Sequence, residues 1–201
     1  MQTTLILGSS SPYRKALLQR LCVDYQTFSP DIDETRLVDE SAEQMVLRLS
    51  LQKAQAIAKQ HPNALIIGSD QCAVLNGDIL GKPHTHENAI KQLQASSGQQ
   101  VSFLTGLCLY DSRTDEYQLD LVLSGIEFRD LTTEEIDAYL RNEKPYNCAG
   151  SFKSEGLGVS LFKGFTGSDP SALMGLPLIR LCDMLRNIGV NLPQHASVLS
   201  Q

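Results

Sequence analysis

The sequence predicts an α/β fold, with a mixed twisted sheet flanked by helices and a smaller lobe beside the main one. Strand-like apolar runs alternate with amphipathic helical patterns early in the chain, and pairs of strand-like segments dominate its middle. The chain has 201 residues, 42% of them hydrophobic, so it can bury a substantial core. We therefore expect a single domain with two lobes over residues 1–201, and the sequence does not fix the position of the boundary between the lobes.

Local patterns place the individual elements along the chain. Strands are predicted at Thr3–Gly8, Tyr25–Ser29, Ala64–Gly68, Val101–Tyr110, Tyr117–Phe128 and Val159–Phe162. A hairpin is predicted around Asn76-Gly77-Asp78. Helices are predicted to begin near Pro12 (with Ser11 as N-cap), Ser41, Thr85, Thr132 and Leu176. Two of these starts, Ser41 with Gln44 and Thr132 with Glu135, have the spacing of a capping box.

Composition excludes several classes of protein. A formal net charge of −6 argues against nucleic-acid binding, which requires a basic surface. No apolar stretch approaches the length of a membrane span. The five cysteines are scattered and contain no Cys-x-x-Cys pair, so neither a zinc ribbon nor a redox dithiol is indicated. We expect a cytoplasmic protein that binds neither nucleic acid nor membrane.

The turn after the first predicted strand has the chemistry of a phosphate site. Gly8-Ser-Ser-Ser-Pro-Tyr-Arg14-Lys15 joins a strand to a helix and presents backbone N–H groups, hydroxyls and two cations. The alternative interpretation is an ordinary serine-rich helix cap. A Walker loop is excluded because no Gly-Lys-Ser/Thr follows a strand.

A second group is acidic. Asp31, Asp33 and Glu34 occupy a loop, and Asp70 follows a buried strand that we expect to end at Ser69-Asp70. Converging carboxylates would hold a hard divalent cation such as Mg²⁺, which uses one or two carboxylates together with substrate phosphates. The alternative for the loop is a solvated acidic turn.

Three lysines form a third group. Lys53 is expected on the polar side of the long helix, Lys82 follows the hairpin and Lys153 lies in a glycine-rich segment. Each alone is typical of a solvated surface lysine. His84 and His86 have no third ligand at a suitable spacing and are not interpreted as a metal pair. Tyr13, in the polar turn, could stack on a base.

Taken together, these segments resemble the Maf family of nucleotide pyrophosphatases over nearly the whole chain. The resemblance rests on Ser9–Arg14, Asp33-Glu34-Thr35, Gln52-Lys53-Ala54, Ile67–Gln71, Gly81-Lys-Pro83 and Cys148–Glu155. It implies a Maf/ITPase-like fold with two lobes and a central cleft, often as a homodimer. The sequence most resembles the branch that acts on 7-methyl-GTP, because Ser69-Asp70-Gln71 replaces the Ala-Asp-Thr of branches that favour dTTP and UTP.

The resemblance also implies roles for individual residues. Asp70 corresponds to the proton acceptor, and Glu34 with Asp70 would hold the divalent cation, Mg²⁺ or Mn²⁺. The phosphates would be held by Ser9, Arg14, Lys53 and Lys82, and substrate selection would fall to Tyr13, Gln71 and Glu155. Tyr13 stands where this branch tends to have Trp, and Lys15 replaces a second Arg.

The expected reaction is hydrolysis of 7-methyl-GTP to 7-methyl-GMP and diphosphate, which would remove modified nucleotides from the pool. The expected substrate is thus a nucleoside triphosphate, and the protein is expected to be a homodimer. Two alternatives stay open: a Maf pyrophosphatase acting on dTTP or UTP, and a non-catalytic regulator of cell division that binds nucleotide. Release of diphosphate would distinguish an enzyme from a binder.

Overall fold

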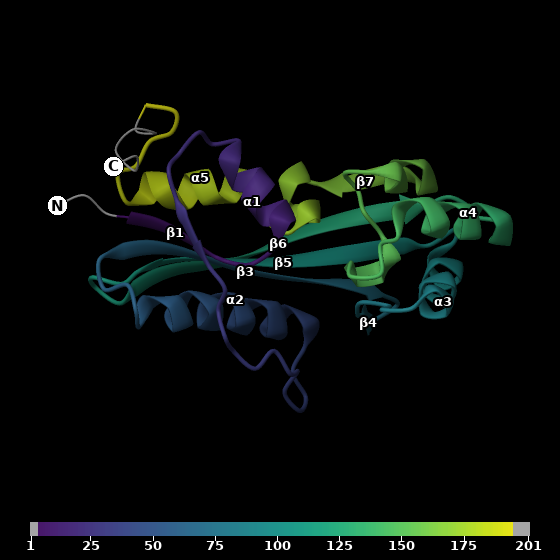
Figure 1. Ribbon diagram of the computed structural model, residues 1–201, viewed down its shortest axis with the longest axis horizontal. Helices are drawn as coiled ribbons and strands as arrows, with labels where there is room; N and C mark the ends of the chain where they lie inside the picture. Colours follow the sequence, from purple (N-terminus) through teal and green to yellow (C-terminus); the bar gives the residue numbers. More distant parts are fainter. Residues whose placement is uncertain (1–3, 195–201) are drawn as a thin grey trace. The chain divides into compact units, whose positions relative to one another are not determined.

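The computed structural model describes residues 4–194, which contain a seven-stranded mixed sheet and five α-helices (Figure 1). The strands are β1 (Thr4–Gly8), β2 (Gln26–Phe28), β3 (Ala64–Leu75), β4 (Asp78–Leu80), β5 (Gln100–Asp111), β6 (Glu116–Phe128) and β7 (Phe162–Gly167). The helices are α1 (Pro12–Gln19), α2 (Ala42–Ala58), α3 (His86–Ser96), α4 (Thr133–Glu143) and α5 (Leu178–Asn187). Three short 3₁₀ helices are η1 (Ala149–Ser151), η2 (Leu157–Leu161) and η3 (Pro170–Met174).

The sheet mixes parallel and antiparallel pairs, which confirms the predicted class. Its strand order is β2-β1-β3-β5-β6-β7, with β4 paired to β3. β1 is parallel to both β2 and β3, whereas β4 and β7 run antiparallel to their partners. Along one edge, β3 pairs with β1 through Ala64–Ile67 and with β4 through Ala73–Leu75. The stretch Gly68–Cys72 lies between these two pairings, and Asp70 N within it donates to Ser50 Oγ of α2 at 2.9 Å.

The chain divides into two compact units. The first comprises the described residues up to Gln71, then Thr105–Val122 and the residues from Asp169 onward. The second comprises Cys72–Leu104 and Leu123–Ser168. Each unit is built from separate stretches of the chain, and strands β3, β5 and β6 contribute residues to both.

The first unit is layered, with helices on both faces of its strands. α2 covers one face and α1 with α5 the other (Figure 1). The α1/α5 side packs a core that includes Leu7, Leu17 and Leu181, and the α2 side packs Ile6, Ala54 and Ile66. Ile6 and Leu7 are neighbours in β1 but belong to opposite cores, because successive strand side chains point to opposite faces.

The second unit contains α3 and α4. The capping box predicted at Thr132 is present, since the Thr132 and Glu135 side chains each accept a backbone hydrogen bond from the other residue. Phe152 makes edge-to-face contacts with Phe128 and Phe162, at centroid distances of 5.5 and 5.8 Å. An aromatic cluster therefore anchors the segment that follows η1.

Several predicted elements need correction. The strand expected to end at Ser69-Asp70 continues to Leu75, so Asp70 lies within β3. The strand predicted at Val159–Phe162 is wrong, because η2 covers most of it and β7 begins at Phe162. The hairpin at Asn76-Gly77 is confirmed, with both residues at positive φ. Thr3, expected in the first strand, lies outside the described residues.

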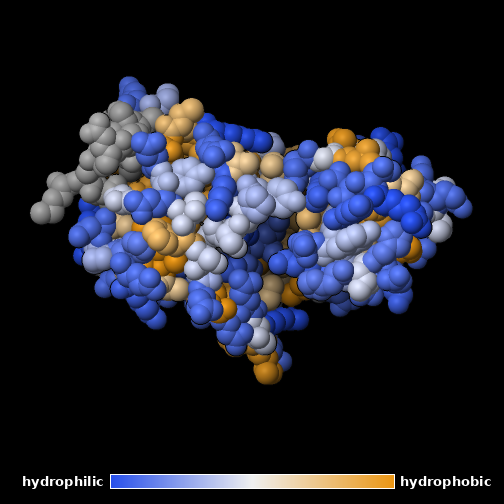
Figure 2. Space-filling model, in the orientation of Figure 1, coloured by the Kyte–Doolittle hydropathy of each residue, from blue (hydrophilic) through white to orange (hydrophobic). Residues whose placement is uncertain are grey.

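Most of the described surface visible in Figure 2 is hydrophilic. The exposed large apolar side chains include Leu37 and Val38 in the β2–α2 loop. Within residues 4–194, no helix is both long enough and apolar enough to cross a membrane.

Candidate active site

A buried carboxylate and a buried lysine form the centre of the candidate site. Asp70 is 8% exposed and Lys53 only 5%. Lys53 Nζ lies 2.6 Å from Asp70 Oδ1 and 2.9 Å from Glu34 Oε1. Because a buried charge is costly unless it is paired, this contact explains how both side chains are accommodated. Glu34 is more than half exposed, so the group opens toward solvent on its side.

Lys53 was expected on the polar side of its helix, and this prediction is wrong. It lies on the buried face of α2, four residues after Leu49 and four before Ile57, both of which are buried. Residues four apart share one face of a helix, so this spacing was the available signal. A lysine within an apolar stripe indicates a buried partner, which here is Asp70.

Two glycines allow α2 to approach the sheet closely enough for this contact. A Cβ atom added at Gly68 would lie 2.1 Å from the Ser50 carbonyl oxygen, and one added at Gly106 would lie 2.4 Å from that of Val46. Ser50 of α2 bonds directly to β3, because its Oγ accepts a hydrogen bond from Asp70 N at 2.9 Å. The backbone next to the carboxylate is therefore fixed by the helix that carries Lys53.

The phosphate-binding turn predicted at Gly8–Lys15 joins β1 to α1. Ser11 is the N-cap of α1, as predicted, and its Oγ accepts from Arg14 N. Arg14 Nε donates to Gly175 O at 2.7 Å, and Nη1 lies 3.5 Å from Ser9 Oγ. Burial lowers the pKa of the Arg14 guanidinium, and the nearby Asp70 and Glu34 carboxylates oppose this effect. Arginine stays protonated in proteins, so a fixed cation accompanies the two carboxylates.

The acidic loop that carries Glu34 is tied to α2 by Arg48. Its Nε and Nη2 donate to the two oxygens of Glu40, at 2.5 and 2.8 Å, and Nη2 also donates to Thr35 O at 3.2 Å. These hydrogen bonds from Arg48 lower the pKa of Glu40 to about 2. Arg48 thereby holds the residue next to Glu34 against the helix that carries Lys53.

The residues present fit a divalent cation that arrives with its substrate. Glu34 and Asp70 converge on one cationic group, the Lys53 ammonium. No group of three or more His, Cys, Asp or Glu side chains suited to a metal occurs within residues 4–194. Proteins typically supply one or two carboxylate ligands to Mg²⁺, and phosphates and water supply its other ligands.

Comparison with known proteins decides the family. The profile of the family described as "Maf-like protein" matches residues 4–188. The chain belongs to this family. A protein of Pseudomonas savastanoi named 7-methyl-GTP pyrophosphatase is 56% identical over 190 residues, 94% of this chain and 99% of the relative. Proteins with the same name from Pseudomonas aeruginosa and Alcanivorax borkumensis are 54% and 53% identical, each over 94% of this chain and 98% and 96% of their own lengths.

Five of the residues that the Maf resemblance assigns come together in the first unit. Direct contacts link Lys53 with Asp70 and Glu34, and Arg14 with Ser9. Tyr13 is half-buried on the first turn of α1, beside Arg14. Gln71 follows Asp70 in β3, and its side chain bonds to Thr105 and to carbonyl groups of η3.

Lys82 and Glu155, also assigned from the Maf resemblance, belong to the second unit. Both are exposed; Lys82 follows β4, and Glu155 accepts a hydrogen bond from Ser154 at 3.3 Å. Lys153 donates to Glu143 from its Nζ. His86, which was not interpreted as a metal ligand, contacts Asp137 at 2.9 Å and Tyr146 at 3.0 Å. The predicted roles of Lys82 and Glu155 in one site with Asp70 stay predictions.

Several residues that position this Maf site were missed in the sequence. Ser50 and Thr105 have no local spacing pattern that marks them, because their partners Asp70 and Gln71 lie 20 and 34 residues away. Arg48 bonds to Glu40 in the preceding loop, eight residues away, a spacing that belongs to no helix or strand pattern. Ser69 Oγ lies 2.8 Å from Gly106 O and 2.9 Å from Gly175 O. Only tertiary structure reveals such contacts.

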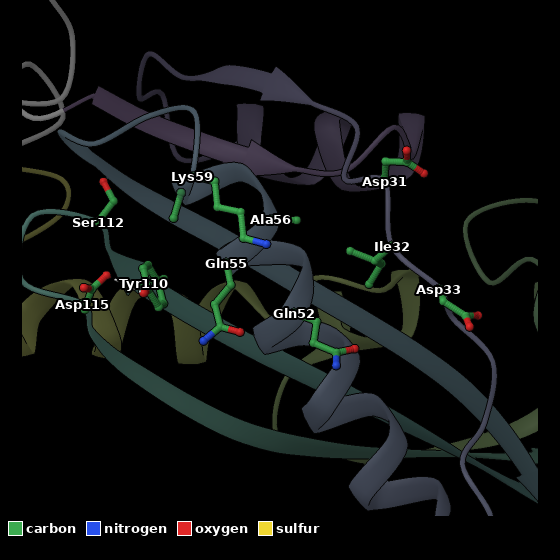
Figure 3. A pocket seen from close by; sticks show the side chains of 11 residues that line it. Asp31, Ile32, Asp33, Gln52, Gln55, Ala56, Lys59, Tyr110, Ser112 and Asp115 are labelled. Atoms are coloured by element: carbon green, nitrogen blue, oxygen red, sulfur yellow. Dashed lines mark hydrogen bonds between the residues drawn. The ribbon is translucent and has the colours of Figure 1, made fainter.

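A pocket of about 720 Å³ lies on the outer side of α2 in the same unit (Figure 3). Asp31 and Asp33 lie on one side of it and Tyr110 and Asp115 on the other, with Gln52 of α2 between them. None of the assigned Maf site residues lines this pocket. Asp31 and Asp33, which were expected to converge with Asp70 on a cation, therefore line a pocket that Asp70 does not line.

Proposed function

We propose that this Maf protein hydrolyses 7-methyl-GTP between its α- and β-phosphates, giving 7-methyl-GMP and diphosphate. The observation that carries the proposal is the buried Asp70, held by Lys53 beside the Arg14 turn. A carboxylate kept next to fixed cations suits attack on an anionic phosphate by water. The names of the relatives support the choice of nucleotide.

Asp70 acts as the general base in this proposal. Lys53 contacts its Oδ1, and the other oxygen, Oδ2, takes the proton of the attacking water. The hydrogen bond that Asp70 N donates to Ser50 keeps the backbone in place, so the carboxylate keeps its direction during the reaction.

The cations neutralise the triphosphate. Arg14 is anchored by Gly175 and Ser9 through Nε and Nη1, and within residues 4–194 no hydrogen bond from Nη2 is found, so in this proposal Nη2 donates to a phosphate oxygen. Lys53 and Lys82 add positive charge, which offsets the charge that builds on the phosphates as diphosphate leaves. Glu34 and Asp70 would hold a divalent cation, Mg²⁺ or Mn²⁺, which would act as a Lewis acid and neutralise charge on the same phosphates.

Recognition of the base falls to Tyr13, Gln71 and Glu155. Guanine methylated at N7 carries a positive charge, so the Tyr13 ring can stack on a cation. The Glu155 carboxylate can balance that charge and accept hydrogen bonds from the guanine edge. Each such contact is worth on the order of 1–2 kcal/mol, or about tenfold in discrimination.

The decisive experiment measures diphosphate release by the purified protein with Mg²⁺ or Mn²⁺ from 7-methyl-GTP, GTP, dTTP, UTP and CTP. We expect the highest kcat/KM for 7-methyl-GTP. Asp70→Asn keeps the shape and removes the charge, and it should lower kcat by at least about 1,000-fold, while Asp24→Asn at an exposed position should not. Preference for a pyrimidine nucleotide would support the dTTP/UTP alternative, and binding without release would support the regulator.

We also propose that the protein works in the cytoplasm as a homodimer. None of the five cysteines takes part in a disulfide, in keeping with a reducing compartment. Light scattering after gel filtration tests the dimer: a mass near 22.1 kDa would contradict it.

A further inference from the structure

The side-chain amide of Gln71 is held from three sides within the first unit. Its Nε2 donates to Ala172 O at 2.7 Å and to Thr105 Oγ1 at 2.9 Å, and it lies 3.3 Å from Leu173 O. Gln71 immediately follows Asp70, and its side chain is half-buried. The Gln71 amide therefore lies next to Asp70, the proposed general base, and its orientation is fixed. Such a group is suited to recognising the substrate.

The chemistry of the partners fixes which end of the amide faces them. Rotating the amide by half a turn would place Oε1 against the carbonyl oxygens of Ala172 and Leu173, which cannot donate. Thr105 does not change this, because its hydroxyl donates to Ala172 O at 3.0 Å and therefore receives from Gln71. Among residues 4–194 no donor to Gln71 Oε1 is found, so this oxygen is able to accept a hydrogen bond from a ligand.

We propose that Thr105 is a positioning residue that orients the Gln71 amide, so that Gln71 presents only an acceptor to the base of the nucleotide. This inference rests on the proposed function. The site then selects a base with an N–H donor on the edge that faces Oε1. Guanine offers N1–H and the 2-amino group. Methylation at N7 makes the ring cationic, so its N–H becomes a charge-assisted and stronger donor.

The surroundings of Thr105 suit this role. Thr105 is fully buried, and its β-branched side chain has few rotamers. The backbone of η3 is held in turn by Asp169, whose Oδ1 accepts from Ser171 N and whose Oδ2 accepts from Ile179 N at the start of α5. The three acceptors around Nε2 therefore belong to a rigid frame, and the hydroxyl of Thr105 is the part of it that a substitution can remove cleanly.

The test compares Thr105→Val, which removes the hydroxyl, with Thr105→Ser, which keeps it. The first readout needs no substrate: exchange of the Gln71 side-chain amide protons with solvent, followed by NMR. Loss of one acceptor should speed this exchange about tenfold in Thr105→Val and leave it near the wild-type rate in Thr105→Ser. Equal exchange in all three proteins would overturn the positioning role.

The second readout is specificity, measured with 7-methyl-GTP and two analogues. In 1,7-dimethyl-GTP a methyl group replaces the N1 hydrogen, and 7-methyl-ITP lacks the 2-amino group. In the wild type, the analogue that lacks the recognised donor should lose about 10- to 30-fold in kcat/KM, because Oε1 is left unpaired. The loss should shrink to less than about threefold in Thr105→Val and return in Thr105→Ser.

The outcomes separate this inference from the proposed function. A wild-type protein that releases diphosphate from no nucleotide overturns the proposed function itself. A wild-type protein that hydrolyses 7-methyl-GTP and both analogues equally well overturns the acceptor role of Gln71 alone. If the analogue that lacks the recognised donor loses as much kcat/KM in Thr105→Val as in the wild type, while Tm is unchanged, the role of Thr105 is overturned.

Discussion

At the scale of single residues, the site depends on charges that are stable only together. Lys53 and Asp70 are both nearly buried, and each would be costly without the other. Glu34 adds a second carboxylate on the exposed side, so the lysine is held between two anions. Burial and pairing thus make one ammonium both a structural member of the α2 interface and a cation of the candidate site.

Replacing Lys53 with Met tests this double role. The substitution keeps much of the volume but leaves Asp70 buried without its cation. We expect a loss of about 3 kcal/mol in the free energy of unfolding, and a fall of at least about 100-fold in kcat/KM. Urea unfolding and diphosphate release measure the two effects.

The matched control is Lys59→Met, an exposed position on the same helical segment. Its free energy of unfolding should stay within about 0.5 kcal/mol of the wild type. If Lys53→Met behaved like this control in both measurements, Lys53 would have neither the structural nor the catalytic role proposed here.

At the scale of elements, the close packing of α2 on β3 and β5 brings Lys53 to Asp70. Gly68 and Gly106 leave room for the helix backbone, and Ser50 bonds across the contact. Any side chain at these glycines forces the helix outward because the obstructing atoms are backbone. Helix position and site geometry should therefore change together.

Gly68→Ala is expected to lower the free energy of unfolding by about 2–3 kcal/mol, through overpacking against Ser50. For a chain of this length that corresponds to a fall in Tm on the order of 5–10 °C. Gly81→Ala is the control, because a Cβ there would meet nothing within 4 Å and Gly81 does not have positive φ. A Gly68→Ala protein with the Tm of the control would show that α2 does not lie this close.

The loop from Asp31 to Glu40 yields a prediction about pH. The pKa of Glu40 is lowered from 4.5 to about 2, chiefly by its hydrogen bonds from Arg48. A depressed carboxyl pKa stabilises the folded state above the unfolded pKa, and this contribution disappears as pH falls through the folded pKa. Glu40→Gln should therefore be less stable than the wild type at pH 7, and the difference should shrink between pH 4.5 and 2. Urea titrations across this range measure it; a constant difference would contradict the assignment.

The elements also show which features the sequence could predict. Both capping boxes were predictable because their partners are three residues apart. The continuation of β3 beyond Asp70 was not, because Gly68-Ser69-Asp70-Gln71 resembles a turn in composition. Tertiary contacts override that local tendency, since Ser69, Asp70 and Gln71 each bond to a distant partner. Family resemblance supplied the site residues that such contacts bring together, but not Arg48 or Thr105, which position them.

At the scale of the whole molecule, an acidic protein is proposed to bind an acidic nucleotide. The formal net charge of −6 repels a triphosphate at long range. At physiological ionic strength, however, charges more than about 8 Å apart are largely screened. Affinity should then depend on the cations nearest the phosphates, namely Arg14 and Lys53, and on a divalent ion that offsets the substrate's charge.

Ligand-induced stabilisation tests this argument without turnover. The analogue of 7-methyl-GTP with a methylene bridge between its α- and β-phosphates cannot be cleaved there. At 100 times its Kd it should stabilise the folded state by about 2.7 kcal/mol, which raises Tm by roughly 5–10 °C. Chelating Mg²⁺ with EDTA should reduce the shift, because the phosphates then lose one source of neutralising charge.

Substitution of the nearest cation completes this test. Arg14→Gln removes the guanidinium beside the Asp70 and Glu34 carboxylates, so the Tm shift should fall by at least half at the same analogue concentration. Arg20→Gln, at an exposed position just after α1, should keep the full shift. If both variants kept it, the phosphates would be bound elsewhere, and the turn between β1 and α1 would be an ordinary helix cap.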